Sequence, residues 1–299
     1  MEAPPGFLNV QNLLLASQPR QRVGPLVYSG GMLGLLLLTA FTVGRGSDDA
    51  MTAACTTVIV SLVVGLSIIG WWGARQYRQE IGRLSQVEEL VQLRRWPQAA
   101  ILLQVILSSP ARTQQARLQA LVYLSNVLSR FHRFDDVVRI DDYLLETVRM
   151  DDMTAHVVRL SRAMALLRED RLLDADRAIM ELRRGAPASN SAGLALVEIY
   201  RDVKTGHPRE ALEIFEKKKD LLAGQLGHRV ADIFGLVARA HDMLDETDAA
   251  QAMWSKATLM TPPAEIARRY PELAPMEQKY EPTYAPPQVA GETAQGGVA

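Results

Sequence analysis

Two long stretches near the N-terminus contain no charged residue, and they limit what this chain can form more than any other feature. The first covers 23–44 and the second covers 50–74. An α-helix rises about 1.5 Å per residue, so about 20 apolar residues cross the hydrocarbon core of a bilayer. Neither stretch has the polar face of an amphipathic helix. The sequence therefore predicts transmembrane helices at 23–44 and 50–74, joined by a short external loop at 45–49.

Basic residues around these stretches predict their orientation. Five arginines flank the two stretches and only one lies in the loop between them; in order they are Arg20, Arg22, Arg75, Arg78 and Arg83, against Arg45. Because basic residues concentrate on the cytoplasmic side of a membrane, segment 1–22 and the C-terminus are both expected in the cytoplasm. A cleaved signal peptide is disfavoured, because a long segment, 1–22, precedes the first stretch and no A-x-A site follows it.

Composition excludes several other classes of protein. Apolar residues make up 48% of the chain, which is enough to build a core and excludes a wholly disordered protein. The 33 basic and 34 acidic residues give a net charge of -1, so no nucleic-acid partner is expected. The single cysteine excludes a disulfide framework and a cysteine-rich zinc module. The Ala-, Leu- and Arg-rich composition favours an integral protein of a bacterial plasma membrane, with the lipid bilayer as one partner.

Beyond residue 80 the sequence repeats a helical pattern with almost no strand signal. The clearest unit lies near the end of the region and consists of Ala238, His241, Leu244, Ala250, Trp254, Ala257 and Pro262. Equivalent positions recur upstream at nearly constant spacing, and we call them the anchor residues: Ala99, Val137, Ala175, Ala211 and Ala250. Small residues at such positions let two antiparallel helices touch, and Pro262 ends the second helix because it lacks an N–H. The pattern predicts about five helix pairs over 81–270.

These positions resemble the tetratricopeptide-repeat superfamily. The resemblance covers most of 81–270; two units match well and three are degenerate, and Asp141 falls where an aromatic residue is expected. The spacing also exceeds the usual period of about 34 residues, and a related helical hairpin repeat or an unrelated helical bundle is the alternative. The resemblance implies a right-handed α-solenoid of helix pairs. Together with the uncharged stretches, it leads us to expect an all-α fold in which a two-helix transmembrane hairpin precedes the solenoid. The first helices of the pairs would line a concave groove that binds a protein or peptide partner.

Six residues are the groove candidates under this interpretation: Asn126, Arg130, Leu160, Met164, Arg239 and Asp242. Asn126 stands where peptide-binding members of the superfamily often carry an asparagine that bonds to the ligand backbone. Val122 stands where binders of chaperone tails carry a lysine, so a clamp for a C-terminal carboxylate is not expected. The middle of the groove is apolar, and a terminal helix at 263–270 could cover it. The sequence leaves the open and the covered groove as equal alternatives.

No catalytic, cofactor-binding or metal-binding residues emerge from the sequence. The five histidines lack the spacing of metal ligands on a helix, and neither a G-x-x-x-x-G-K loop nor a G-x-S-x-G elbow occurs. The tail 271–299 is rich in Pro, Gly and Ala and is expected to be disordered. We therefore expect a non-enzymatic scaffold or adaptor that binds a partner at the cytoplasmic membrane face. The alternative is an accessory subunit of a membrane enzyme, secretion or transport complex.

Overall fold

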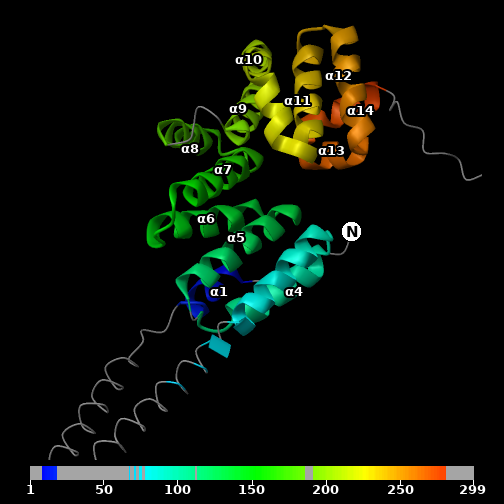
Figure 1. The fold of residues 1–299 in the computed structure, drawn as a ribbon. Helices are drawn as coiled ribbons and strands as arrows, with labels where there is room; N and C mark the ends of the chain where they lie inside the picture. The colour runs from blue at the N-terminus through cyan, green and yellow to red at the C-terminus, as the bar shows by residue number, and fades with distance from the viewer. Residues whose placement is uncertain are drawn as a thin grey trace, which may run out of the picture. The chain divides into compact units, whose positions relative to one another are not determined.

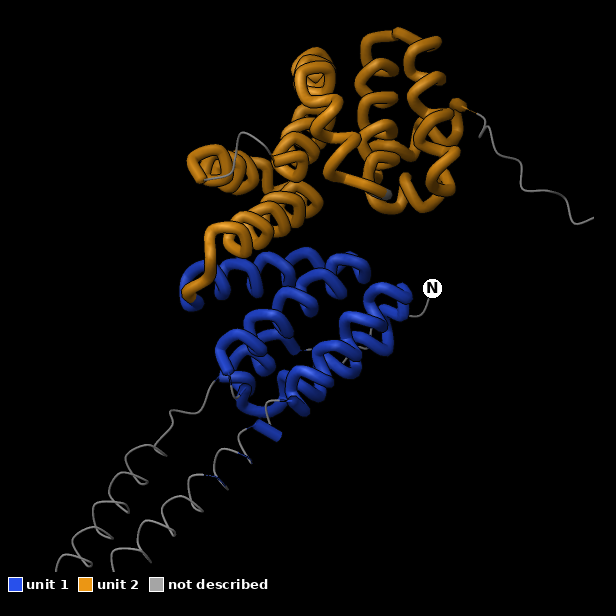
Figure 2. Tube along the Cα trace, viewed as in Figure 1, with its two compact units in different colours: residues 1–148 blue, residues 149–299 orange. Residues whose placement is uncertain are grey.

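The computed structural model describes residues 9–18, 67, 71, 74, 75, 78–111, 113–185 and 191–280 (Figure 1). All regular secondary structure within these residues is helical, which confirms the all-α prediction. The described residues form two compact units, 1–148 and 149–299 (Figure 2). We describe each unit by itself.

The prediction of a transmembrane hairpin, and with it the predicted membrane location, needs correction. Among the described residues, no helix is both long enough and apolar enough to cross a bilayer. The predicted spans 23–44 and 50–74 and the loop 45–49 lie outside the described residues, apart from Ser67, Trp71 and Ala74. The prediction used the length and the apolar composition of the uncharged stretches. A span also requires a continuous helix of that length, and the structure describes none.

Unit 1 contains two helix pairs and a short N-terminal helix. Helical residues 78–92 precede α4 (Trp96–Leu107), and α5 (Gln114–Arg130) precedes α6 (Phe134–Thr147). Helix α4 packs on α5, and α5 packs on α6, so successive helices stack along the chain. The N-terminal helix α1 (Val10–Ala16) contacts α4 and α6 and buries Val10 and Leu13.

Unit 2 contains three helix pairs followed by a short helical segment. The pairs are α7 (Asp152–Arg168) with α8 (Leu172–Arg184), α9 (Ala192–Thr205) with α10 (Pro208–Leu226), and α11 (Val230–Met243) with α12 (Thr247–Met260). The first helices also contact each other, α7 with α9 and α9 with α11. This stacking of helix pairs makes the chain an α-solenoid-like protein.

The same turn joins the two helices of every pair. One residue in each turn has a left-handed backbone, with φ between 57° and 81°: Arg94, His132, Asp170, Gly206 and Asp245. The N–H of the next residue bonds to a carbonyl five residues back at 2.8–3.1 Å, which is the Schellman arrangement at a helix C-terminus. Each of these turn residues lies five positions before its anchor residue, so the turns repeat with the same period as the anchors.

Burial of the anchor residues explains why the pairs form. The side chains of all five are 0–1% exposed, so each second helix lies directly against its first helix: Ala99, Val137, Ala175, Ala211 and Ala250. The residue four positions later is also buried in every pair, and in α12 it is Trp254, which is fully buried. In α6 that residue is Asp141, whose carboxylate accepts a 3.0 Å hydrogen bond from the hydroxyl of Ser125 on α5. A polar pair therefore takes the place of the expected aromatic side chain.

Candidate functional site

The predicted groove residues Asn126 and Arg130 lie on the exposed face of α5 in unit 1. The buried face of this helix carries Leu121 and Leu124, both fully buried. Thr113 starts the helix, because its hydroxyl accepts a 3.2 Å hydrogen bond from the N–H of Ala116. These contacts fix which face of α5 points outward, and both candidates are on it.

Arg130 lies beside an aromatic side chain at the end of this face. Its guanidinium is 5.1 Å from the centre of the Trp96 ring, within the range of a cation–π interaction. About two turns before Arg130 on α5, Val122 is half-buried. About three turns before Arg130, Gln119 is exposed. The amide of Gln119 donates a 3.4 Å hydrogen bond to the hydroxyl of Tyr123. The α5 face thus offers a guanidinium, a carboxamide and some apolar surface to solvent.

Leu160 and Met164 lie on α7 in unit 2, where both are half-buried. One turn and two turns before Leu160, Val157 and Met153 are 52% and 61% exposed, so the apolar face of α7 reaches solvent at its N-terminal half. Leu160 also contacts α9 closely. A Cβ atom on Gly193 would lie 2.7 Å from Leu160 Cδ1, so any larger residue there would make the Leu160 side chain shift.

Arg239 and Asp242 lie on α11, where Arg239 is half-buried and the chain itself covers Asp242. The carboxylate of Asp242 contacts Arg239 at 2.5 Å, Lys279 at 2.5 Å and the hydroxyl of Tyr280 at 3.0 Å. Burial alone would raise the pKa of Asp242, but the hydrogen bonds from Lys279 and Tyr280 outweigh burial and lower its pKa. Two of the six candidates therefore belong to unit 1 and four to unit 2, and the carboxylate of Asp242 is occupied by Lys279 and Tyr280.

A C-terminal segment, residues 263–280, provides this cover. It consists of α13 (Pro263–Arg269), a 3₁₀ turn η3 (Pro271–Leu273) and α14 (Ala274–Lys279), which pack beside α11 (Figure 1). Its large apolar side chains are at most 5% exposed: Ile266, Tyr270, Leu273, Met276 and Tyr280. The segment covers part of α11, whereas the apolar middle of the predicted groove lies on α7, where Val157 remains 52% exposed. The choice between an open and a covered apolar stripe therefore stays a prediction. The prediction of a disordered tail from residue 271 was wrong for 271–280, while 281–299 lie outside the described residues.

Two tyrosine rings and one glutamate connect the segment to α9. The Tyr270 and Tyr200 rings pack edge to face, with centroids 5.0 Å apart. The hydroxyl of Tyr200 donates to both carboxylate oxygens of Glu272 at 3.2 Å, and Lys204 Nζ lies 2.5 Å from the same carboxylate. Burial, followed by the charge of Glu272, raises the pKa of Tyr200, so its hydroxyl stays protonated and donates.

A second set of polar contacts connects the segment to α11. Asp232, whose side chain is 1% exposed, accepts hydrogen bonds from Arg269 at 2.5 Å and from the hydroxyl of Tyr270 at 3.3 Å. Burial raises the pKa of Tyr270, and the nearby charge of Asp232 adds to this effect. Gly235 leaves room for the segment, since a Cβ there would be 3.0 Å from Leu273 Cδ1. The segment is therefore held by both apolar and charged contacts.

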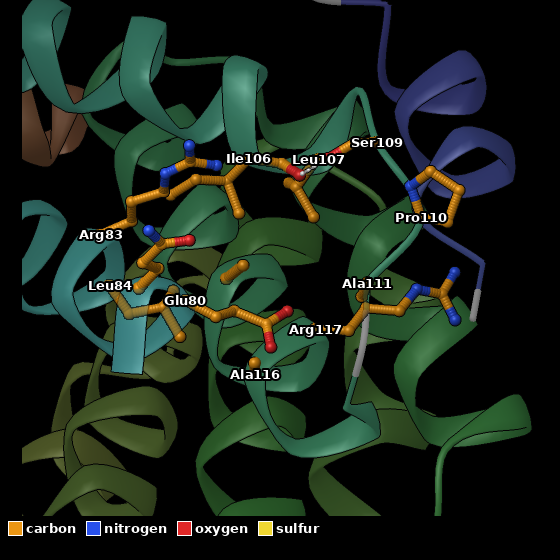
Figure 3. Close-up of a pocket in the computed structure, with 12 residues that line it drawn as sticks. Glu80, Arg83, Leu84, Ile106, Leu107, Ser109, Pro110, Ala111, Ala116 and Arg117 are labelled. Carbon is orange, nitrogen blue, oxygen red and sulfur yellow. Dashed lines mark hydrogen bonds between the residues drawn. The ribbon is translucent and has the colours of Figure 1, made fainter. Parts of the chain in front are cut away.

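A cavity of about 130 Å³ lies in unit 1 between helical residues 78–92, the end of α4 and the start of α5 (Figure 3). Arg117 lines it, but this side chain already binds the N-terminal residues. Its guanidinium donates to the Leu14 carbonyl and the Tyr143 hydroxyl at 2.8 Å, and to the Ser17 hydroxyl at 3.1 Å. These contacts hold α1 in place, so the cavity reflects packing around a structural arginine.

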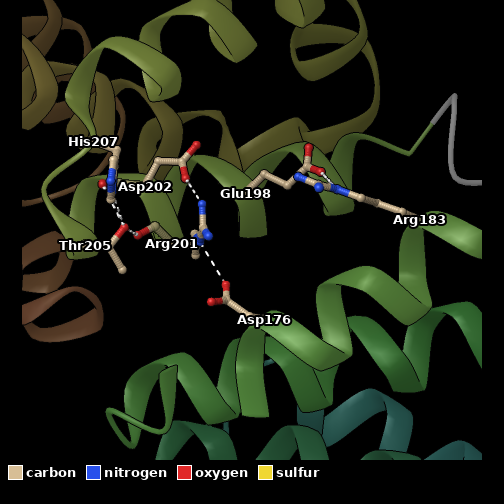
Figure 4. Close-up of polar contacts among 7 residues, drawn as sticks. All are labelled: Asp176, Arg183, Glu198, Arg201, Asp202, Thr205 and His207. Carbon is tan, nitrogen blue, oxygen red and sulfur yellow. Dashed lines mark hydrogen bonds and ion pairs between the residues drawn. The ribbon is translucent and has the colours of Figure 1, made fainter. Parts of the chain in front are cut away.

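A second cavity, of about 170 Å³, lies between α8 and α9, and Figure 4 shows the ion pairs around it. Arg183 contacts Glu198 at 2.7 Å, and Arg201 contacts Asp176 at 2.9 Å and Asp202 at 2.7 Å. Burial raises the pKa of Asp202, although Arg201 opposes this effect. Both arginines around this cavity are paired with carboxylates, and the arrangement joins two successive helix pairs.

One buried serine–histidine pair has the composition of a nucleophile and a base. His156 Nε2 lies 2.8 Å from the hydroxyl of Ser191. However, that hydroxyl accepts the N–H of Leu194 at 3.1 Å and caps α9. Burial and the charge of Arg159 lower the pKa of His156, so the ring is neutral near pH 7. We assign the pair to the α9 N-terminus, a role that the sequence alone did not indicate.

Within the described part of the chain, no group of three or more His, Cys, Asp or Glu side chains could hold a metal ion. Comparisons with known proteins found no matching family model, no matching curated protein and no matching solved structure. The residues and contacts above therefore carry the functional argument alone.

Proposed function

We propose that this chain is a non-catalytic, tetratricopeptide-like module that binds a protein or peptide partner on the inner faces of its first helices. One observation carries the proposal: in unit 2 such a face already holds a short helical segment, residues 263–280. The chain thus contains an example of the kind of ligand that these helices accept. Helix-in-groove recognition works in the same way, through apolar anchors on one face of a short helix.

The face of α5 is the proposed site for an outside partner. It belongs to the same class of helix as α9 and α11, namely the first of its pair, and Asn126 and Arg130 are exposed on it. The carboxamide of Asn126 has both a donor and an acceptor, so it suits the polypeptide backbone of a ligand. The guanidinium of Arg130 suits a carboxylate of that ligand.

Site-specific photo-crosslinking tests the position of this site. A photoreactive amino acid replaces Asn126 in the full chain, and in the control it replaces Arg139, which is 67% exposed on α6. We expect one discrete crosslinked partner from position 126 and none from position 139. Equal crosslinking from both positions would place the partner elsewhere.

A further inference from the structure

We infer that the C-terminal segment, residues 263–280, is an exchangeable internal ligand, and that the face of α9 and α11 beneath it binds a partner peptide of the same chemistry. Such a peptide is a short helix with a tyrosine, an acidic residue two positions later, and apolar residues three and six positions later. In this chain those residues are Tyr270, Glu272, Leu273 and Met276. The inference rests on the proposed function and adds to it the chemical class of the ligand for unit 2.

The first argument concerns α9 and α11, which we call the host helices. Their charged residues remain paired when the segment leaves. Lys204 contacts Asp170 at 2.7 Å as well as Glu272. Asp242 contacts Arg239 as well as Lys279.

Asp232 on α11 also has two ion-pair partners. It lies 3.7 Å from Arg229, and it contacts Arg269 of the segment. An unpaired buried charge is strongly destabilising, and this duplication avoids it. The host face is therefore balanced in charge with or without its segment.

The second argument is that the segment depends on the host for its order. Helix α13 has seven residues and α14 has six, and no side chain caps the N-terminus of either. Helices this short are unstable alone in water, because nucleation costs more than a few hydrogen bonds return. By contrast, α9 and α11 each pack against their own second helix, α10 and α12. The host helices thus each have a long helix of their own as a partner, while the segment consists of short helical pieces that pack beside α11.

The third argument is that the segment fits by matched chemistry at defined points. Glu272 meets Tyr200 and Lys204, and Tyr270 meets the carboxylate of Asp232. Leu273 packs over Gly235, where a Cβ would be only 3.0 Å away. An exchanging peptide must supply the same aromatic ring, carboxylate and apolar side chains, because otherwise it would expose buried apolar surface.

A fluorescent peptide with the sequence of residues 262–281 tests the inference on the full chain. The variant Glu272→Lys places a positive charge against Lys204 and so weakens the binding of the chain's own segment, which competes with the peptide. We call such a variant a loosened chain. Because a competitor reduces apparent affinity by the fraction of sites it occupies, we expect the Glu272→Lys chain to bind the peptide at least about tenfold more tightly than the wild-type chain. Glu277→Lys is the matched control, since Glu277 is exposed on the same segment, and it should bind like the wild type. A peptide that itself carries Glu272→Lys should bind at least about tenfold more weakly to the loosened chain.

Lys279→Glu gives a second loosened chain, because it places a negative charge against Asp242. This chain should also bind the peptide more tightly than the wild-type chain does. If either loosened chain keeps its helix content and binds the peptide no better than wild type, the inference is overturned. If both chains lose their helix content, the segment is a required part of the fold and the inference is also overturned. No outside partner is used, so this result is independent of the crosslinking test on α5.

Discussion

The hydroxyl of Ser125 on α5 donates a 3.0 Å hydrogen bond to the carboxylate of Asp141 on α6, and both side chains are at most 3% exposed. Ser125→Ala removes the donor and leaves the carboxylate buried. We expect unit 1 to lose about 1.5–3 kcal/mol of unfolding free energy, the usual range for a hydrogen bond to a charged group. Chemical denaturation of the full chain measures this loss. Ser129→Ala, at a half-buried position one turn later on α5, serves as control and should cost less than half as much.

We expect the stability of the last helix pair, α11 and α12, to depend on Trp254. It is fully buried, so Trp254→Ala should cost about 3–5 kcal/mol, as aromatic truncations in cores do. Its indole Nε1 is buried and has no hydrogen-bond partner within the described part of the chain. Trp254→Phe therefore loses volume without losing a hydrogen bond, and should cost about 1–2 kcal/mol. Equal melting of the Ala variant and the wild type would show that the repeat register is wrong.

Asp245 occupies the left-handed position of the last turn, with φ of 61°. The equivalent residue between α9 and α10 is Gly206, for which this conformation has no steric cost. We expect Asp245→Gly to stabilise unit 2 by about 0.5–1 kcal/mol. The comparison is Asp248→Gly in the first turn of α12, which should destabilise by about 1 kcal/mol. Thermal unfolding of the two variants gives the signs, and destabilisation by Asp245→Gly would contradict the turn assignment.

Acid should weaken the contact between Asp242 and the C-terminal segment. The pKa of Asp242 is lowered in the folded chain, where hydrogen bonds from Lys279 and Tyr280 outweigh burial. A lowered folded pKa means that the stabilisation is complete above the unfolded pKa of 3.8 and is lost as the pH falls through the folded value. We expect Asp242→Asn to be less stable than wild type at pH 7. The difference should shrink steadily below about pH 4. A difference that stays constant down to pH 2 would show that the carboxylate is not held in this way.

The repeat could be predicted from sequence because small anchors such as Ala99 and Ala250 have a strict geometric role. They allow two helices to touch, so their spacing reports the period directly. Asp141 could not be interpreted in this way, because its partner Ser125 lies on a different helix, 16 residues away. Only the fold shows that a polar pair fills that part of the core.

The part of the C-terminal segment from residue 271 onward was missed because its prolines suggested disorder. Pro271 and Pro275 lie in the first turns of η3 and α14, where a missing N–H costs nothing. The apolar residues Tyr270, Leu273, Met276 and Tyr280 recur every three or four positions, which is a helical signal. That signal could have predicted both the helix and the covered face of α11.

In the uncharged stretches 23–44 and 50–74, the sequence pattern predicted too much rather than too little. Their composition led to a prediction of membrane spans. A span also requires a continuous apolar helix, and none was found among the described residues. The groove candidates differ in exposure, because side-chain exposure can depend on distant parts of the chain. Exposure of Asn126 depends only on its own helix, whereas exposure of Asp242 depends on a segment that begins only after the next helix, α12, has ended.

Capture of the partner by a double variant on α5 tests the central claim most directly. Asn126→Ala with Arg130→Glu removes the backbone-binding amide and reverses the charge on the exposed face. The control pair is Glu146→Ala with Arg139→Glu, two exposed positions on α6 with the same kinds of change. All three chains should have equal helix content. The wild-type and control chains should recover the same partner from a cell extract in equal amounts, and the α5 variant should recover less than about a tenth of it, since two lost contacts together exceed about 1.4 kcal/mol. Equal recovery by all three chains would contradict the account and show that the α5 face does not bind the partner.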